Sequence, residues 1–311
     1  SDTSLRLLSG FFCVGVCMQR SITPAVLTAL ISLYLIWGST YFAMRLVVEG
    51  MPPLLSAGIR YTIAGSLMFV FLKIRGAAWP SAVQWRDAGI IGALLLLGGN
   101  GAVALALDQG VSSGMSALVV AIAPLFALIF ASLWGQAVQG RDWVGIALGF
   151  CGVLLLNTGS ELAASPIGAV LLIAAALVWA FGSMWGKRLQ QPPAFMASAV
   201  QMLVGGVVLV LAGGLHGETM TTMPSAQSLW ALAYLIFFGS ILGFSSYVYL
   251  LATVRPALAT SYAYVNPVVA VAIGVWLGGE QVETLELVGM TIILAGVVLV
   301  CWPSGRQQSD S

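Results

Sequence analysis

The sequence has few charged residues. Only 7% of its 311 residues are Asp, Glu, Lys or Arg, whereas 59% are hydrophobic and the mean hydropathy is +0.99. Soluble globular proteins carry about 25% charged residues, so this composition excludes that class and indicates a membrane protein. The formal net charge of +1 also argues against nucleic acid as a partner.

The residue types that carry most enzyme and metal chemistry are scarce as well. His216 is the only histidine. The four cysteines (Cys13, Cys17, Cys151 and Cys301) do not have the spacing of a metal site, apart from one i,i+4 pair. There is no nucleophile accompanied by a base and no GxxxxGK[ST] phosphate-binding loop. The sequence therefore predicts no enzyme activity, no bound metal or cofactor, and no use of ATP.

Apolar runs of membrane-spanning length dominate what is present. Turn or charge signals such as EGMPP, NTGSE and KRLQQPP separate them. Each run is expected to be helical, because unpaired backbone polar groups are not tolerated in hydrocarbon. The predicted fold class is an all-α integral membrane protein with ten transmembrane helices, at residues 24–46, 54–72, 88–107, 114–135, 142–157, 166–186, 193–214, 228–252, 256–278 and 285–302.

The basic residues predict how these helices are oriented. If the N-terminus is cytoplasmic, Arg45 alone lies on the far side, Arg60 lies within the second helix, and the other lysines and arginines lie in the cytoplasm, namely Arg6, Arg20, Lys73, Arg75, Arg86, Arg141, Lys187, Arg188, Arg255 and Arg306. Lysine and arginine favour the cytoplasmic side of a membrane. Both termini are therefore expected in the cytoplasm.

The N-terminal segment fits this pattern poorly. Residues 1–17 contain LRLLSGFFCVGVC, which is apolar but too short to span, and no small-residue cleavage site of a secretory signal precedes the first helix. We expect residues 1–21 to form a disordered or amphipathic cytoplasmic segment. Residues 1–17 either belong to the native protein or precede a true start at Met18. Residues 304–311 are expected to be a cytoplasmic tail.

The two halves of the chain resemble each other. WVGIALGFCGVLLL at 143–156 aligns without gaps with LVGMTIILAGVVLV at 287–300, and VVAIAPLFALIF at 119–130 aligns with YAYVNPVVAVAI at 262–273. This predicts two five-helix repeats, at residues 22–160 and 164–303. Because five is odd, the repeats would have opposite orientations in the membrane, an arrangement typical of secondary transporters.

Short motifs accompany these repeats. They are IWGSTYF in the first helix, an arginine within the second, AP and NP midway along the fourth and ninth, and GE at 279–280. Over residues 22–303 the chain resembles the EamA-type transporters of the drug/metabolite transporter superfamily. The resemblance implies a multi-pass protein of the bacterial inner membrane that moves amino acids, other metabolites or drugs.

Polar and aromatic residues inside the predicted helices are candidates for a substrate site. Trp37 and Trp179 occupy equivalent deep positions in the two repeats, and the ninth helix has polar groups on two faces, so protein or a cavity must surround it. Ordinary aromatic packing, or backbone capping by an amide among glycines, is the alternative explanation. The predicted substrate-binding residues are Trp37, Tyr41, Asn100, Trp179, Ser183, Tyr262, Tyr264 and Asn266.

Prolines and charged residues suggest moving parts. Pro124 and Pro267 occupy matching positions and are predicted to act as hinges, unless they form static kinks that only shape packing. Arg60 and Glu280 are gate candidates, paired with each other near the outer end. Alternatively, Arg60 reaches the interface or a backbone carbonyl.

Together these features predict a secondary transporter that exports small metabolites such as amino acids by alternating access between the repeats. Its expected partners are a small-molecule substrate and membrane lipid. No acid or histidine is placed at mid-membrane, so ion coupling would use groups near a gate, or the substrate gradient alone would drive transport. A passive channel, an importer and an intramembrane enzyme are the alternatives. Gly145 and Gly149 indicate close helix packing, within the scaffold or in a homodimer.

Overall fold

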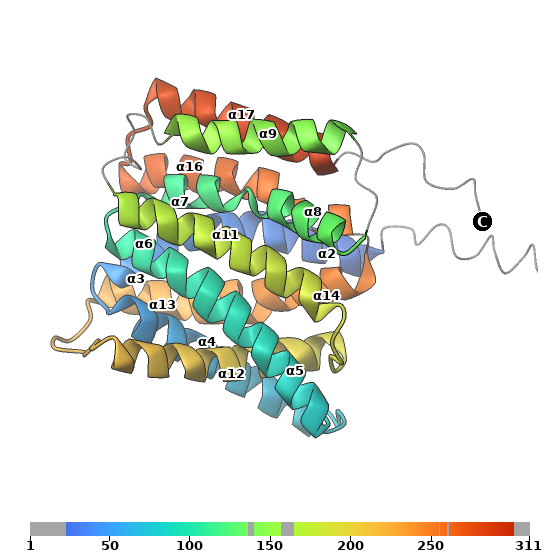
Figure 1. Ribbon diagram of the computed structural model, residues 1–311. Helices are drawn as coiled ribbons and strands as arrows, with labels where there is room; N and C mark the ends of the chain where they lie inside the picture. Colours follow the sequence, from blue (N-terminus) through green and yellow to red (C-terminus); the bar gives the residue numbers. More distant parts are fainter. Residues whose placement is uncertain (1–22, 136–139, 157–164, 255, 260, 302–311) are drawn as a thin grey trace, which may run out of the picture.

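The computed structural model describes residues 23–135, 140–156, 165–254, 256–259 and 261–301. Every regular element in these ranges is a helix, and the helices lie side by side in one bundle (Figure 1). The all-α class is therefore confirmed for the described part of the chain. The predicted N-terminal segment at 1–21 and the tail at 304–311 fall outside it.

Seven helical stretches among the described residues are long and apolar enough to cross a membrane. They are Pro24–Val48, Pro53–Ile74, Ala82–Asp108, Ser113–Leu133, Pro166–Gly186, Ala194–Leu215 and Ala226–Thr253. Three further apolar helices contain shorter uninterrupted stretches, within α9 (Gly140–Leu156), α16 (Tyr262–Gly278) and α17 (Thr284–Cys301). A spanning helix needs about 20 residues, so helix length alone supports seven spans and leaves the predicted total of ten as a proposal.

The long stretches are divided into shorter elements. The first contains α2 (Pro24–Ser32), η1 (Leu33–Trp37) and α3 (Gly38–Val48), and the second is α4 (Pro53–Ile74). The others comprise α5 (Ala82–Gly92), η2 (Ala93–Gly101), α6 (Ala102–Asp108), α7 (Ser113–Val120), α8 (Ala123–Leu133), α11 (Pro166–Gly186), α12 (Ala194–Leu215), α13 (Ala226–Tyr234), η3 (Leu235–Phe244) and α14 (Ser245–Thr253). A short helix, α15 (Pro256–Ala259), precedes α16.

Local sequence signals explain where several helices begin and end. Ser81 and Gln84 form a capping box at the start of α5, each side chain bonding the backbone N–H of the other residue. Pro53 and Pro166 occupy first turns, where a missing N–H removes no helical hydrogen bond. Gly279 ends α16 with a φ of 62°, which a glycine adopts without strain.

Glycines bring pairs of helices into close contact at the two edges of the bundle. At one edge α4 packs on α12, where a Cβ on Gly206 would lie 2.5 Å from the backbone nitrogen of Thr62. At the other edge α9 packs on α17, where a Cβ on Gly296 would lie 2.6 Å from the carbonyl oxygen of Gly145 and 2.8 Å from the nitrogen of Gly149. Figure 1 shows α16, α7, α11, α3 and α13 between these two pairs, and α5 at the same edge as α4 and α12.

The helices that pass through the centre are irregular. The segments η1, η2 and η3 are π-helices, a form that often occurs at functional positions. The two matched prolines differ in this conformation. Ala121 and Ile122 form a turn that interrupts the helix, and Pro124 lies in the first turn of the next helix, α8. Pro267, by contrast, lies inside the uninterrupted α16. Their role as hinges stays a prediction.

Candidate functional site

A small cavity lies at the centre of the bundle, where the two halves of the chain meet. Its volume is about 50 Å³, which corresponds to room for roughly three to five water molecules. Five of the eight predicted substrate-binding residues line it, and Arg60 lines it as well. The five are Trp37, Tyr41, Asn100, Trp179 and Tyr262.

An aromatic cluster forms one wall of this cavity. The distance between ring centroids is 5.6 Å for Trp37 and Trp179, 5.3 Å for Trp37 and Tyr262, and 5.1 Å for Trp37 and Tyr247. The indole N–H of Trp179 donates to the hydroxyls of Tyr247 and Tyr262, at 3.1 and 3.2 Å. Edge-to-face packing and these shared bonds hold the rings in fixed orientations. The cluster consists of Trp37, Trp179 and Tyr262, which line the cavity, and of Tyr247, which packs against these three rings, and we call it the aromatic wall.

Ser183 forms hydrogen bonds with two residues of the aromatic wall. Its hydroxyl donates to the carbonyl oxygen of Trp179 at 2.6 Å and lies 2.6 Å from the hydroxyl of Tyr247. Trp37 is anchored separately, because its indole N–H donates to the carbonyl oxygen of Gly239 at 3.1 Å. Ser183 does not line the cavity but contacts two residues of its wall.

Arg60 is buried in α4, with 3% of its surface exposed. Its Nε donates to the hydroxyl of Ser240 at 2.7 Å, and its Cζ lies 4.5 Å from the centre of the Tyr61 ring. The predicted pairing of Arg60 with Glu280 is wrong in this conformation. Arg60 faces the central cavity, whereas Glu280 follows the end of α16 and meets other partners.

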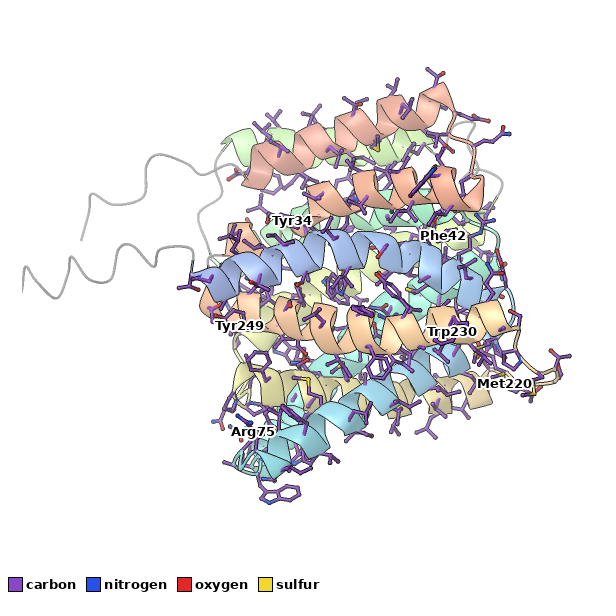
Figure 2. The ribbon with its side chains drawn as sticks, turned by 180° about the vertical axis from the view of Figure 1, so that it is seen from behind. Tyr34, Phe42, Arg75, Met220, Trp230 and Tyr249 are labelled. Atoms are coloured by element: carbon purple, nitrogen blue, oxygen red, sulfur yellow. The ribbon has the colours of Figure 1, made fainter. Side chains whose placement is uncertain are left out.

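Glu280 joins three segments at the end of the bundle where Phe42 and Trp230 lie in Figure 2. Its carboxylate accepts from Nη1 of Arg45 at 2.7 Å, from the hydroxyl of Ser113 at 2.7 Å and from the backbone N–H groups of Ser113 and Gly114 at 3.0 and 3.2 Å. The last two belong to the start of α7, where free N–H groups and the helix dipole favour a carboxylate. We call Arg45, Ser113, Gly114 and Glu280 the end latch.

The environment of Glu280 keeps it ionised. Burial raises the pKa of its carboxyl, but hydrogen bonds from Ser113, Arg45 and the α7 backbone outweigh this, so the pKa lies below its usual range. Arg45 also bonds Glu49 at 3.2 Å. A second cavity, of about 360 Å³, borders the latch and is lined in part by Arg45, Glu49 and Glu280.

Two predicted substrate residues stand apart from the cavity. Asn266 is 4% exposed, does not line the cavity, and its Oδ1 has no hydrogen-bond partner among the described residues. The backbone of Tyr264 belongs to α16, but its side chain is outside what the structure describes. Among the described residues, no group of three His, Cys, Asp or Glu could hold a metal ion.

Sequence reasoning missed several residues of the site. Tyr61 lines the cavity, Tyr247 completes the aromatic wall, and Arg45 holds the end latch. A signal existed for Arg45, since it is the only basic residue that the charge pattern leaves on the far side. Tyr247 belongs to the polar segment SSYVY, but its facing direction could not be read from that segment.

Comparison with known proteins gives a consistent result. The model of the EamA-like transporter family matches residues 23–158 and again residues 166–302. The chain is 48% identical over 272 residues to the "Uncharacterized inner membrane transporter YedA" of Escherichia coli K12, covering 88% of this chain and 89% of that protein. It is 27% identical over 278 residues to a "Probable amino-acid metabolite efflux pump" of Salmonella typhimurium LT2, covering 85% and 90%.

A solved crystal structure shares the fold. It superposes with a TM-score of 0.65 at 19% sequence identity, over 90% of this chain and 98% of that one. The apolar helices, the central cavity, the double family match and the transporter relatives agree with one another. The chain is a membrane transporter and belongs to the EamA-like transporter family.

Proposed function

We propose that this chain is a secondary transporter that exports small metabolites such as amino acids across the bacterial inner membrane. The observation that carries the proposal is the composition of the central cavity. Trp37, Tyr41 and Asn100 come from the first half of the chain, whereas Trp179 and Tyr262 come from the second. Secondary transporters built from inverted repeats bind substrate between the repeats near the membrane midplane.

In this proposal ten helices form two inverted five-helix repeats, at residues 22–160 and 164–303. The double match of the family model supports two repeats. The described chain begins with α2 and ends with α17 at the same end of the bundle (Figure 1), as an even number of crossings requires. The relative named as an inner membrane transporter supports the location, and the positive-inside rule supports cytoplasmic termini.

Alternating access requires that a substrate-sized cavity open toward one side at a time. The present cavity of about 50 Å³ is too small for an amino acid, so we assign this conformation to a contracted state between the two openings. The aromatic wall would close the path toward one side and the end latch would close it toward the other. Pro124 and Pro267 are the proposed hinges, since each lies near one of the helices that contribute to the cavity.

The direction of export draws on the relative named as an amino-acid metabolite efflux pump. No Asp, Glu or His lines the central cavity among the described residues. A proton-coupled carrier usually has such a group in its pathway. Transport driven by the substrate gradient is therefore the simpler proposal.

Counterflow in liposomes tests this function. Purified protein is reconstituted with unlabelled amino acid inside and labelled amino acid outside, with and without a pH gradient. We expect saturable exchange for at least one substrate class and a large loss in Trp179→Ala, which removes part of the aromatic wall. Trp230→Ala is the matched control, because Trp230 lies in α13 and is 77% exposed. A flux that does not saturate with substrate concentration and shows no counterflow of labelled amino acid would indicate a channel instead.

A further inference from the structure

A buried positive charge faces the central cavity without a negative partner. Arg60 is 3% exposed, and no carboxylate oxygen lies within 4.0 Å of its guanidinium among the described residues. Isolated burial of a cation in a low-dielectric interior is costly. A membrane protein retains such a group when the group has a function.

The arrangement around Arg60 fixes its guanidinium and leaves part of it unused. Ser240 engages Nε, and the Tyr61 ring stacks against Cζ. Gly239 leaves space beside Nη2, since a Cβ there would lie 2.8 Å from that atom. The two Nη groups thus belong to a guanidinium that is oriented by its neighbours and borders a cavity.

The rest of the cavity lining favours an anion in the same place. Tyr41 and Asn100 supply neutral groups that can donate hydrogen bonds, and none of the described lining residues is acidic. A cationic amine entering the cavity would meet Arg60 without a compensating carboxylate. The aromatic wall offers ring faces and edges to an apolar part of the ligand.

We infer that Arg60 binds the carboxylate of the transported metabolite, so that substrates are amino acids or other small organic acids and not cationic amines. This inference rests on the proposed transport function and names its substrate class. A planar guanidinium matches a carboxylate through two parallel hydrogen bonds, which an ammonium cannot reproduce. The substrate carboxylate would thereby supply the counter-charge that the described lining residues do not provide.

The test uses ligands that differ only in the carboxylate. Phenylalanine and leucine are compared with their amides, and 3-phenylpropionate with phenethylamine. Binding is read as the ligand-induced rise in melting temperature of the detergent-purified protein, and transport as counterflow in liposomes. The variants are Arg60→Met and Arg60→Lys, with Arg75→Gln as the control because Arg75 is exposed in the loop after α4 and carries the same charge.

We expect the acids to bind and exchange at least about tenfold better than their amides or the amine, as for the loss of a charge-assisted contact. Arg60→Met should abolish that preference, Arg60→Lys should retain part of it, and Arg75→Gln should behave as wild type. Without ligand, Arg60→Met should melt no lower than wild type, because it removes an uncompensated buried charge.

Either of two exchange results would overturn the inference while leaving the transporter in place. One is equal exchange of acids and amides, and the other is an unchanged acid preference in Arg60→Met. If Arg60→Met melts far lower without ligand and keeps the acid preference, Arg60 is a structural residue. If no acid shifts the melting temperature, the carboxylate site is excluded, and if no compound in the panel exchanges either, the proposed function fails with it.

Discussion

The aromatic wall depends on the hydroxyl of Tyr247. This residue is 1% exposed, and its Oη meets the indole N–H of Trp179 at 3.1 Å and the hydroxyl of Ser183 at 2.6 Å. Buried polar groups need such partners, because an unpaired group cannot recover its lost hydration. The wall is therefore a hydrogen-bonded network and not a set of rings in contact only.

Replacing Tyr247 by phenylalanine should destabilise the protein by about 1–2 kcal/mol. The ring stays, but both hydroxyl contacts are lost. Trp179 can still bond Tyr262, and Ser183 can still bond the Trp179 carbonyl, so the loss stays moderate. Tyr249→Phe on the same helix is the control and should change stability by less than about 0.5 kcal/mol. Thermal unfolding in detergent measures both, and equal melting temperatures for the two variants would contradict this role.

At the residue scale, the sequence predicted which side chains line the cavity better than it predicted their hydrogen-bond partners. Symmetry between repeats and helical periodicity placed Trp37 and Trp179 deep in the bundle, where they are found. The predicted partner of Arg60 was wrong because a shared position near the outer end of two helices does not show which side chains meet, and Arg60 bonds Ser240 whereas Arg45 bonds Glu280. Asn266 was predicted to face substrate, yet its position behind the cavity lining depends on packing that no single helix encodes.

Among the elements, α4 and α12 form a seam in which glycines on both helices lie at points of close contact. A Cβ at Gly58 would lie 2.6 Å from a methyl carbon of Val210, and one at Gly206 would lie 2.5 Å from the nitrogen of Thr62. Helices in membranes associate largely through such close packing, since hydrocarbon gives no hydrophobic drive. The seam is expected to act as rigid scaffold.

Two substitutions on α12 should therefore differ in their effect on stability: Gly206→Ala should destabilise the protein, and Gly214→Ala should not. At Gly206 the new Cβ meets backbone, so the helices must separate, and overpacking of this kind costs about 1–3 kcal/mol. At Gly214 nothing lies within 4 Å, and alanine should be neutral or stabilise the helix by up to about 1 kcal/mol. The melting temperatures of the two variants check this, and a loss at Gly214 equal to that at Gly206 would refute the packing argument.

The end latch links the loop after α16 to the start of α7. Because hydrogen bonds hold the pKa of Glu280 below its usual range, the stabilising contribution is present above the unfolded pKa of about 4.3 and is lost as the pH falls through the folded pKa. Between pH 5 and 8 Glu280 stays ionised, and the latch does not respond to a proton gradient in that range.

The melting temperature of Glu280→Gln should consequently lie below that of wild type by a constant amount from pH 5 to pH 8. The difference should shrink only below about pH 4.3, where the carboxyl is protonated first in the unfolded chain and, at lower pH, in the folded protein. Glu283→Gln, which changes an exposed acid in the same loop, is the control and should melt as wild type. A difference that changes between pH 6 and 8 would show that Glu280 titrates there and would make it a candidate for proton coupling.

For the whole molecule, the sequence predicted the class of the fold and its family, and left the conformational state open. The repeats, the apolar runs and the motifs are properties of the chain that hold in every state. In the proposed transport cycle, closure of the cavity to about 50 Å³ is a property of one state, because the same sequence would also adopt open ones. Helix α16 is shorter than a full span because it begins only at Tyr262, after the separate helix α15 (Pro256–Ala259), within a run that hydropathy alone reads as continuous.

Orientation in the membrane follows from charge placement and can be tested on the intact protein. In a variant whose four cysteines are replaced by serine, single cysteines are introduced at Glu283 and at Arg75, both exposed and in loops at opposite ends of the bundle. A membrane-impermeant maleimide applied to right-side-out vesicles should label Glu283→Cys at once and Arg75→Cys only after permeabilisation, because the proposed orientation keeps the basic loops in the cytoplasm. The reverse pattern would place both termini outside, and labelling of both sites or of neither before permeabilisation would mean that these loops do not lie on opposite sides of the membrane.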